Sequence, residues 1–322
     1  MSIISPVRDA LPFHWLSGIA EVSGRTSTSV KAWITDEKFI HAEQIQNHKK
    51  EVFYIGANTE FARCIAHDIG RMASASFESA FGMMGSKEIP NSSAWTLIRA
   101  YYAAYYAANA ISRLFGNFVA YLDGEQITAL NKVIKFSGNN QNILGGGVYQ
   151  FIVNSDFSEF TIQKLKNGSH EETWKVFGNL LERLSIDLLT KTEFSSSATV
   201  QNASVVLDEI INVLKTQPCG EGFNWLSRMR NEINYQHLYG TWHPHEKSKN
   251  FYEGIQQKLS QWRSVPNLSV MDDKYKLVKF SATCACIISI CRELVLELVE
   301  RNSRGNSFLK YGALQVLVKT QL

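Results

Sequence analysis

The sequence has little net charge, few cysteines and no long apolar run, and each of these absences excludes some classes of protein. The 33 lysines and arginines nearly balance the 30 aspartates and glutamates, leaving a net charge of +3. Any contact with nucleic acid therefore needs a local patch. The longest uncharged apolar runs, 100–112 and 280–291, are too short to span a bilayer. Residues 1–10 carry Arg8 and Asp9 with no apolar region after them, so no signal peptide is expected. The sequence predicts a cytoplasmic protein with no membrane partner.

The five cysteines do not form a recognisable disulfide or metal pattern. Cys284, Cys286 and Cys291 fall in one apolar segment, while Cys64 and Cys219 lie far away along the chain. Their spacing lacks the two-residue gaps of a zinc knuckle. We expect all five to be reduced and to act as small hydrophobic residues.

Motifs for nucleotide hydrolysis and for serine or cysteine catalysis are also missing. The glycines at 145–147 are not followed by Lys-Ser or Lys-Thr at the spacing of a phosphate-binding loop, so they are interpreted as a turn. There is no Gly-x-Ser-x-Gly elbow and no Cys/His nucleophile pair with a clear context. We expect no cofactor.

Three histidines and a glutamate follow one another closely at His237, His243, His245 and Glu246. These residue types would suit zinc, and a chelator-sensitive metal hydrolase is one reading of them. No second ligand cluster accompanies them. The preferred interpretation is a polar loop in which His243 or His245 contacts an RNA backbone, with no metal site.

Apolar residues at helical spacing dominate the chain. Hydrophobic residues make up 45% of the sequence and aromatic residues 11%, enough for the core of one large or two ordinary domains. Periodicity, caps and breakers predict helices at 59–84, 94–115, 171–190, 203–216, 223–238, 247–262 and 274–301. The predicted fold class is mainly α.

Three parts of the chain lack this strong helical pattern. Residues 1–58 mix turn residues with short apolar pieces such as 30–34 and 52–55, which indicates an irregular N-terminal cap or a short hairpin. Residues 117–170 read as a small insertion into the bundle at 59–305, with strands at 149–153 and 160–162. Residues 306–322 are expected to be a C-terminal tail.

The segment 94–115 alternates alanine with tyrosine. Alanine permits close helix approach and the tyrosines fill the gaps, which predicts a buried bundle helix ending at Gly116. Asn109 is a polar exception in it. It is interpreted either as a satisfied core amide or as a residue near a phosphate-binding pocket.

The segment 230–239 is where the sequence hints most clearly at chemistry. In a helix, Arg230 and His237 are seven residues apart and nearly eclipsed, roughly 10.5 Å along the axis, with Asn234 between them. Arginine supplies a permanent charge for phosphate, and neutral histidine exchanges a proton near pH 7. These side chains on one helix face would suit metal-free RNA cleavage.

This segment resembles the HEPN superfamily (higher eukaryotes and prokaryotes nucleotide-binding). Its ribonucleases carry arginine, then a polar residue, with four to six residues in total before histidine, and Arg230, Asn231 and His237 fit that spacing. Tyr239 matches the tyrosine that follows the histidine in HEPN toxins. The Tyr-Tyr-Ala-rich segment 94–115 is similar to the second helix of many HEPN domains.

The resemblance implies a HEPN-like helical bundle and a metal-independent endoribonuclease. His237 would move a proton at the ribose 2'-hydroxyl or the leaving oxygen, and Arg230 would stabilise the charged phosphorane. Asn231 or Asn234 would orient the histidine or the phosphate. The family implies 2',3'-cyclic phosphate products, a composite site in a homodimer, a toxin or antiphage role and a regulatory partner such as an antitoxin. Tyr239 would be the position of modification by a nucleotidyltransferase. The alternative is a catalytically silent helical module that binds a partner protein or a nucleotide.

Overall fold

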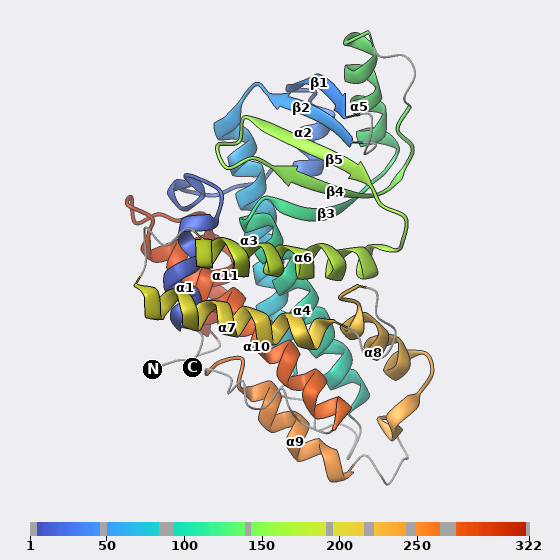
Figure 1. Cartoon of the computed structure of the whole chain (residues 1–322), viewed down its shortest axis with the longest axis vertical. Helices are drawn as coiled ribbons and strands as arrows, with labels where there is room; N and C mark the ends of the chain where they lie inside the picture. Colours follow the sequence, from blue (N-terminus) through green and yellow to red (C-terminus); the bar gives the residue numbers. More distant parts are fainter. Residues whose placement is uncertain are drawn as a thin grey trace.

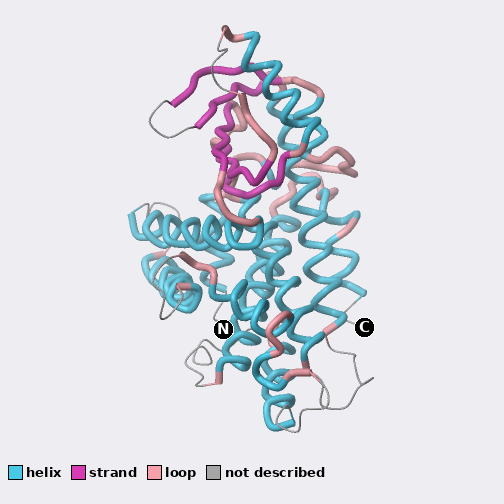
Figure 2. Tube along the Cα trace, turned by 90° about the vertical axis from the view of Figure 1, so that its right-hand side faces the viewer, coloured by secondary structure: helices cyan, strands magenta, loops and turns pink. Residues whose placement is uncertain are grey.

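Helices form most of the protein, and a small sheet covers one end of the helical body (Figure 1). The computed structural model describes residues 5–45, 50–83, 93–138, 143–190, 196–215, 222–242, 249–264 and 275–319. Within these ranges there are eleven α-helices and one five-stranded sheet. The mainly α prediction is confirmed, and Figure 2 shows the strands gathered at that same end.

Three long helices form the centre of the body. They are α3 (Asn58–Gly82), α4 (Ala94–Leu114) and α10 (Lys276–Glu300). The alanines of α4 are almost all inaccessible to solvent, and α4 packs against both α3 and α10. Small side chains along α4 let the neighbouring backbones approach closely, as its sequence predicted.

The remaining long helices cover this centre. These are α6 (Ser169–Thr190), α7 (Ser197–Leu214), α8 (Trp225–Asn234) and α9 (Lys249–Ser260). α6 lies between α4 and α7, α8 packs on α4, and α9 packs on α10. The short α1 (Ser5–Ala10) contacts α7 and α10, where Arg8 Nε donates to Glu297 Oε2 at 2.8 Å.

The sheet is built from two distant parts of the sequence. Its strands are β1 (Phe39–Ile45), β2 (Lys50–Ile55), β3 (Asn117–Leu122), β4 (Gly147–Val153) and β5 (Glu159–Lys164), in the antiparallel order β1-β2-β5-β4-β3. Phe53 on β2 pairs with Phe160 on β5, and their rings stack with centroids 4.9 Å apart. The N-terminal segment and the insertion, expected as separate parts, therefore share one sheet.

Two predictions for the segments outside the bundle need correction. Residues 30–34, interpreted as part of an irregular cap or hairpin, begin the helix α2 (Val30–Thr35), because the Ser29 hydroxyl caps it by accepting from the Ala32 amide at 3.2 Å. Beyond residue 306 the chain forms a short 3-10 turn, η8 (Phe308–Tyr311), and the helix α11 (Ala313–Lys319). Both pack on α3, so this part is not a free tail.

α2 and the helix α5 (Gly124–Phe136) hold the sheet to the body. α5 packs on α2 and β1, and α2 packs on α3. Trp33 of α2 contacts Phe61 of α3 with ring centroids 4.5 Å apart. His41 of β1 is hydrogen-bonded to Glu51 of β2 and to Ser137 after α5. The sheet and the bundle consequently share one hydrophobic core.

The described cysteines are buried thiols. Cys64, Cys284, Cys286 and Cys291 are unpaired, and burial raises their pKa values, to about 12 for Cys64, Cys286 and Cys291. Cys219 lies outside the described residues. None of the described helices is long and apolar enough to cross a membrane.

Candidate functional site around Arg230

The helix that carries Arg230 is shorter than its sequence predicted. α8 ends at Asn234, and His237 has a left-handed backbone with φ of 52°. In a continuing helix the Ile233 carbonyl would accept from the amide of residue 237. Here it accepts instead from Trp242 Nε1 at 2.8 Å. The prediction that Arg230, Asn234 and His237 share one helix face is therefore wrong, because the chain leaves the helix before His237.

Arg230 is half-buried and held by two hydrogen bonds. Its Nη2 donates to the Tyr102 hydroxyl at 2.7 Å, and its Nη1 donates to Asn231 Oδ1 at 2.8 Å. The Nε–H has no hydrogen-bond partner among the described residues. A guanidinium has five N–H donors, so part of its capacity is unused.

Aromatic rings surround this guanidinium. Its Cζ lies 5.7, 5.6 and 5.2 Å from the ring centroids of Tyr101, Tyr102 and Tyr235. Within the described part of the chain, no carboxylate oxygen lies within 4.0 Å of it. Burial opposes the charge, but the Tyr102 hydrogen bond and the tyrosine hydroxyls raise the Arg230 pKa above its usual value. The site thus holds a positive charge that no described acidic side chain pairs with.

His170, near the start of α6, belongs to the same site. Its Nδ1 lies 2.9 Å from the Tyr101 hydroxyl, and its ring lies 4.4 Å from that of Tyr105. Trp174 Nε1 donates to the Tyr101 hydroxyl at 3.1 Å. The Tyr101 hydroxyl donates to His170 Nδ1 in one tautomer of the ring and accepts from it in the other.

The positive charge of Arg230 affects the protonation of His170. Burial, followed by the positive charge of Arg230, lowers the pKa of His170. The His170 ring lies 5.8 Å from that of Tyr102, whose hydroxyl binds Arg230. α4, α6 and α8 all contact one another (Figure 1), so they bring an arginine, a neutral histidine and several tyrosines together.

His237 lies beside a different part of α4 from Arg230. It is exposed, and its ring packs against Trp242 with centroids 5.2 Å apart. Trp242 in turn meets Trp95 edge to face at 5.5 Å. Trp95 precedes Tyr102 by two helical turns, roughly 10.5 Å along α4. His237 therefore sits toward the start of α4, while Arg230 sits beside Tyr102.

The predicted asparagines have different surroundings. Asn231 accepts a hydrogen bond from Arg230, and Asn234 is the last residue of α8. Asn109 is a buried amide whose Nδ2 donates to the Tyr105 carbonyl and whose Oδ1 accepts from Arg113. Its structural interpretation, a satisfied core amide, is the one the contacts support, and its oxygen binds Arg113 instead of Arg230.

Tyr239 is the residue proposed for modification. Its hydroxyl donates to Glu232, and burial followed by this hydrogen bond raises its pKa. Its backbone is left-handed, with φ of 70°.

The predicted contacts of His243 and His245 with substrate fall outside the described residues, as does Glu246. Among the residues that are described, no group of three or more histidine, cysteine, aspartate or glutamate side chains could hold a metal ion. The metal-hydrolase alternative rests on His237, His243, His245 and Glu246, of which only His237 is described.

His170 was not identified from the sequence. In the sequence, His170 comes just before the predicted helix 171–190. The residues around it along the chain do not indicate that it contacts Tyr101. The tyrosines of 94–115 were recognised as packing residues, and their hydroxyls were not assigned to a site. The signal that was present is the density of hydroxyl-bearing rings on one helix, which is unusual for a purely apolar contact.

Comparison with known proteins returns no match: no protein-family model fits the sequence, and no curated protein or solved structure is similar to the chain. The HEPN resemblance consequently depends on the Arg230 motif and the tyrosine-rich α4, and it remains a prediction.

Proposed function

We propose that this protein is a metal-independent endoribonuclease of HEPN type and that its helical body is a HEPN-like bundle. The observation that carries the proposal is the half-buried Arg230 guanidinium, which no described carboxylate pairs with and which tyrosine rings surround. RNA supplies what such a site lacks, a phosphate anion next to flat bases.

Binding of RNA would use both the charge of Arg230 and the tyrosine rings around it. The remaining N–H groups on the two terminal nitrogens of Arg230 would donate to phosphate oxygens. The ring of Tyr235 is exposed and next to Arg230, so a base can stack on it. Base stacking of this kind contributes about 1–3 kcal/mol per base and is tolerant of sequence.

Cleavage would proceed by attack of the ribose 2'-hydroxyl on the adjacent phosphorus. A histidine takes the 2'-hydroxyl proton, the 2'-oxygen bonds to phosphorus, and the 5'-oxygen leaves with a proton from an acid. The product ends in a 2',3'-cyclic phosphate. Arg230 stabilises the extra negative charge on the phosphorane oxygens.

Two histidines are candidates for the proton transfer. The resemblance points to His237, and the contacts of the site point to His170, which is nearer to Arg230 through Tyr102. The family builds composite sites from two protomers that bring two such motifs face to face, and a homodimer would in this way let His237 of one protomer act beside Arg230 of the other. A toxin or antiphage role with a regulatory partner belongs to the same proposal.

The test is cleavage of labelled single-stranded RNA by the purified full chain in EDTA. Wild type is compared with Arg230→Ala, His170→Ala and His237→Ala. Loss of one charge-stabilising donor should lower the rate by about 10²–10³-fold. Replacing the histidine that transfers the proton should lower the cleavage rate by about 10²–10⁴-fold.

Arg228→Ala is the matched control. Arg228 is on the same helix, is partly exposed and lies 3.9 Å from Glu232, so its loss removes an arginine from α8 without touching the site. Rates equal to wild type in Arg230→Ala, or no cleavage by wild type, would contradict the proposal.

A binding module without catalysis is the second candidate. It is favoured by the position of His237, which the end of α8 separates from Arg230. This candidate predicts that the chain binds an RNA oligonucleotide or a nucleotide, that Arg230→Ala weakens the binding, and that no product with a cyclic phosphate forms. Measuring binding and cleavage on the same samples separates the two candidates.

A further inference from the structure

A polar pocket lies where three distant parts of the chain meet. Its volume is about 390 Å³. Arg25 and Thr26 come from the N-terminal segment, His67, Arg71 and Ser74 come from α3, and the residues of η8 and the start of α11 close it. None of the lining residues belongs to the Arg230 site, and α11 and α8 lie on opposite sides of the body in Figure 1.

The lining is positively charged. Two arginines contribute to it, and none of the lining residues is acidic. Arg25 lies with its guanidinium 5.4 Å from the Tyr311 ring centroid, and within the described ranges no carboxylate oxygen lies within 4.0 Å of it. An anion entering the pocket therefore meets no like charge on its walls.

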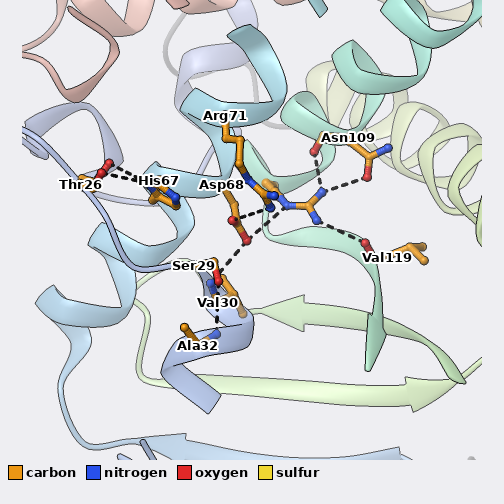
Figure 3. A network of polar contacts seen from close by, with 10 residues as sticks. Thr26, Ser29, Val30, Ala32, His67, Asp68, Arg71, Asn109 and Val119 are labelled. Carbon is orange, nitrogen blue, oxygen red and sulfur yellow. Dashed lines mark hydrogen bonds and ion pairs between the residues drawn. The ribbon is translucent and has the colours of Figure 1, made fainter. Parts of the chain in front are cut away.

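An acid next to the pocket, Asp68, is already engaged with arginines. Asp68, on the buried side of α3, accepts from Arg71 Nη2 at 3.1 Å, and its other oxygen lies 3.9 Å from Arg113 Nε (Figure 3). One carboxylate thus faces two guanidinium groups. Asp68 leaves one positive charge uncompensated in this cluster, and Arg25 adds another at the pocket.

The polar groups of the pocket are held in place. His67 Nδ1 donates to the Thr26 carbonyl at 2.9 Å, as the dashed lines of Figure 3 mark, and this bond holds the ring in place. Arg63 donates to the carbonyls of Ser23 and Arg25 at 2.9 and 2.7 Å. These bonds tie the segment that carries Arg25 and Thr26 to α3, so the cationic groups face one pocket without rearrangement.

We propose that this pocket binds a phosphate group, either as free phosphate or as the end of a small phosphorylated molecule. Two guanidinium forks and the hydroxyl of Thr26 are donors that phosphate oxygens accept from. The volume lies in the range of small-molecule sites, about 300–1,000 Å³. That exceeds what phosphate alone occupies, so the structure favours the phosphorylated molecule of the two sources.

Isothermal titration of the full chain tests this proposal. The probes are inorganic phosphate, ribose 5-phosphate and AMP, with ribose and adenosine as uncharged controls. The phosphorylated probes should bind, and the uncharged ones should not. Tighter binding of ribose 5-phosphate or AMP than of inorganic phosphate identifies a phosphorylated molecule, whereas equal binding identifies free phosphate.

Variants connect the binding to the pocket. Arg25→Ala and Arg71→Ala should each weaken binding of the phosphorylated probes at least tenfold. Arg25 has no described ion pair, so its replacement is the variant that leaves the fold least affected. Lys135→Ala on α5 removes the same charge far from the pocket and should bind as wild type does.

Three results would overturn the proposal. They are the absence of binding by all phosphorylated probes, equal binding of adenosine and AMP, and unchanged affinity in Arg25→Ala. Binding of an RNA oligonucleotide alone, with none of the small probes, would also overturn it and assign the pocket to a nucleic-acid surface.

Discussion

Arg230 on α8 and Tyr102 on α4 are joined by a hydrogen bond of 2.7 Å between Nη2 and the phenolic oxygen. The two residues are 128 positions apart, so the bond fixes how α8 sits on α4. It also sets the direction of the guanidinium, because Asn231 holds the other terminal nitrogen. The candidate site therefore depends on helix packing as much as on its own residues.

Removing only the Tyr102 hydroxyl should destabilise the protein. Tyr102→Phe leaves the ring in place but takes away a partner of a charged donor, which typically contributes about 1.5–3 kcal/mol. Urea unfolding should show this decrease in the free energy of unfolding. Tyr106→Phe is the control, since its half-buried ring packs against Tyr102 and its hydroxyl has no hydrogen bond among the described residues. Equal stability of the two variants would show that the Arg230–Tyr102 bond is not formed.

His170 should make stability depend on pH. Its pKa is lowered below 6.5 in the folded chain, so below pH 6.5 the unfolded chain binds more protons. The free energy of unfolding should therefore decrease as pH falls below about 6.5. His170→Asn keeps an acceptor for Tyr101 but removes the titration, so the advantage of wild type over this variant should shrink between pH 7.5 and 5.5.

The size of this pH effect has an upper bound. One whole proton corresponds to about 1.4 kcal/mol per pH unit, and solvent screening at a partly exposed ring keeps the change below that. Denaturant unfolding at the two pH values measures the difference. A constant difference between wild type and His170→Asn would contradict the lowered pKa.

Gly178 of α6 should not tolerate a side chain. A Cβ added there would lie 2.0 Å from Cγ of Phe223, a buried residue just before α8. The ring would have to move, and such overpacking costs about 1–3 kcal/mol. That exceeds the roughly 0.5–1 kcal/mol that alanine gains over glycine within a helix.

Thermal unfolding of Gly178→Ala should give a lower midpoint than wild type, and RNA cleavage should decrease with it because α8 shifts. Gly124→Ala in α5 is the control, since an added Cβ there meets nothing within 4 Å. A stabilised Gly178→Ala would show that Phe223 is free to move aside.

Asp68 should be needed for stability. Asp68→Asn preserves shape but leaves the buried guanidinium of Arg113 without the one carboxylate that lies within 4.0 Å of it in the described part of the chain. Removing one partner of a buried ion pair typically costs about 3–5 kcal/mol. Asp9→Asn changes an exposed residue of α1 and should stay within about 0.5 kcal/mol of wild type. A cost below 1 kcal/mol for Asp68→Asn, measured by urea unfolding, would mean that Asn109 and the Val119 carbonyl suffice for Arg113.

The long helices were predictable because their signals are local. Apolar spacing, alanine content and terminal glycines act within a few turns, and α3, α4, α6 and α10 begin and end within about two residues of their predicted bounds. The strands at 149–153 and 160–162 were recognised for the same reason. That β2 pairs with β5 was not predictable, because strand pairing joins residues more than 100 positions apart.

The sequence by itself determined the mainly α character and the presence of Arg230 beside Asn231 on a helix, since both depend on neighbours along the chain. Only the tertiary structure decided where that helix stops and which residues surround it. The Trp242 indole donates to the Ile233 carbonyl, where a continuing helix would have the amide of His237, so His237 lies outside α8. The packing of α6 on α4 brings His170 to Tyr101. Both contacts are made across space, and no periodicity within either segment encodes them.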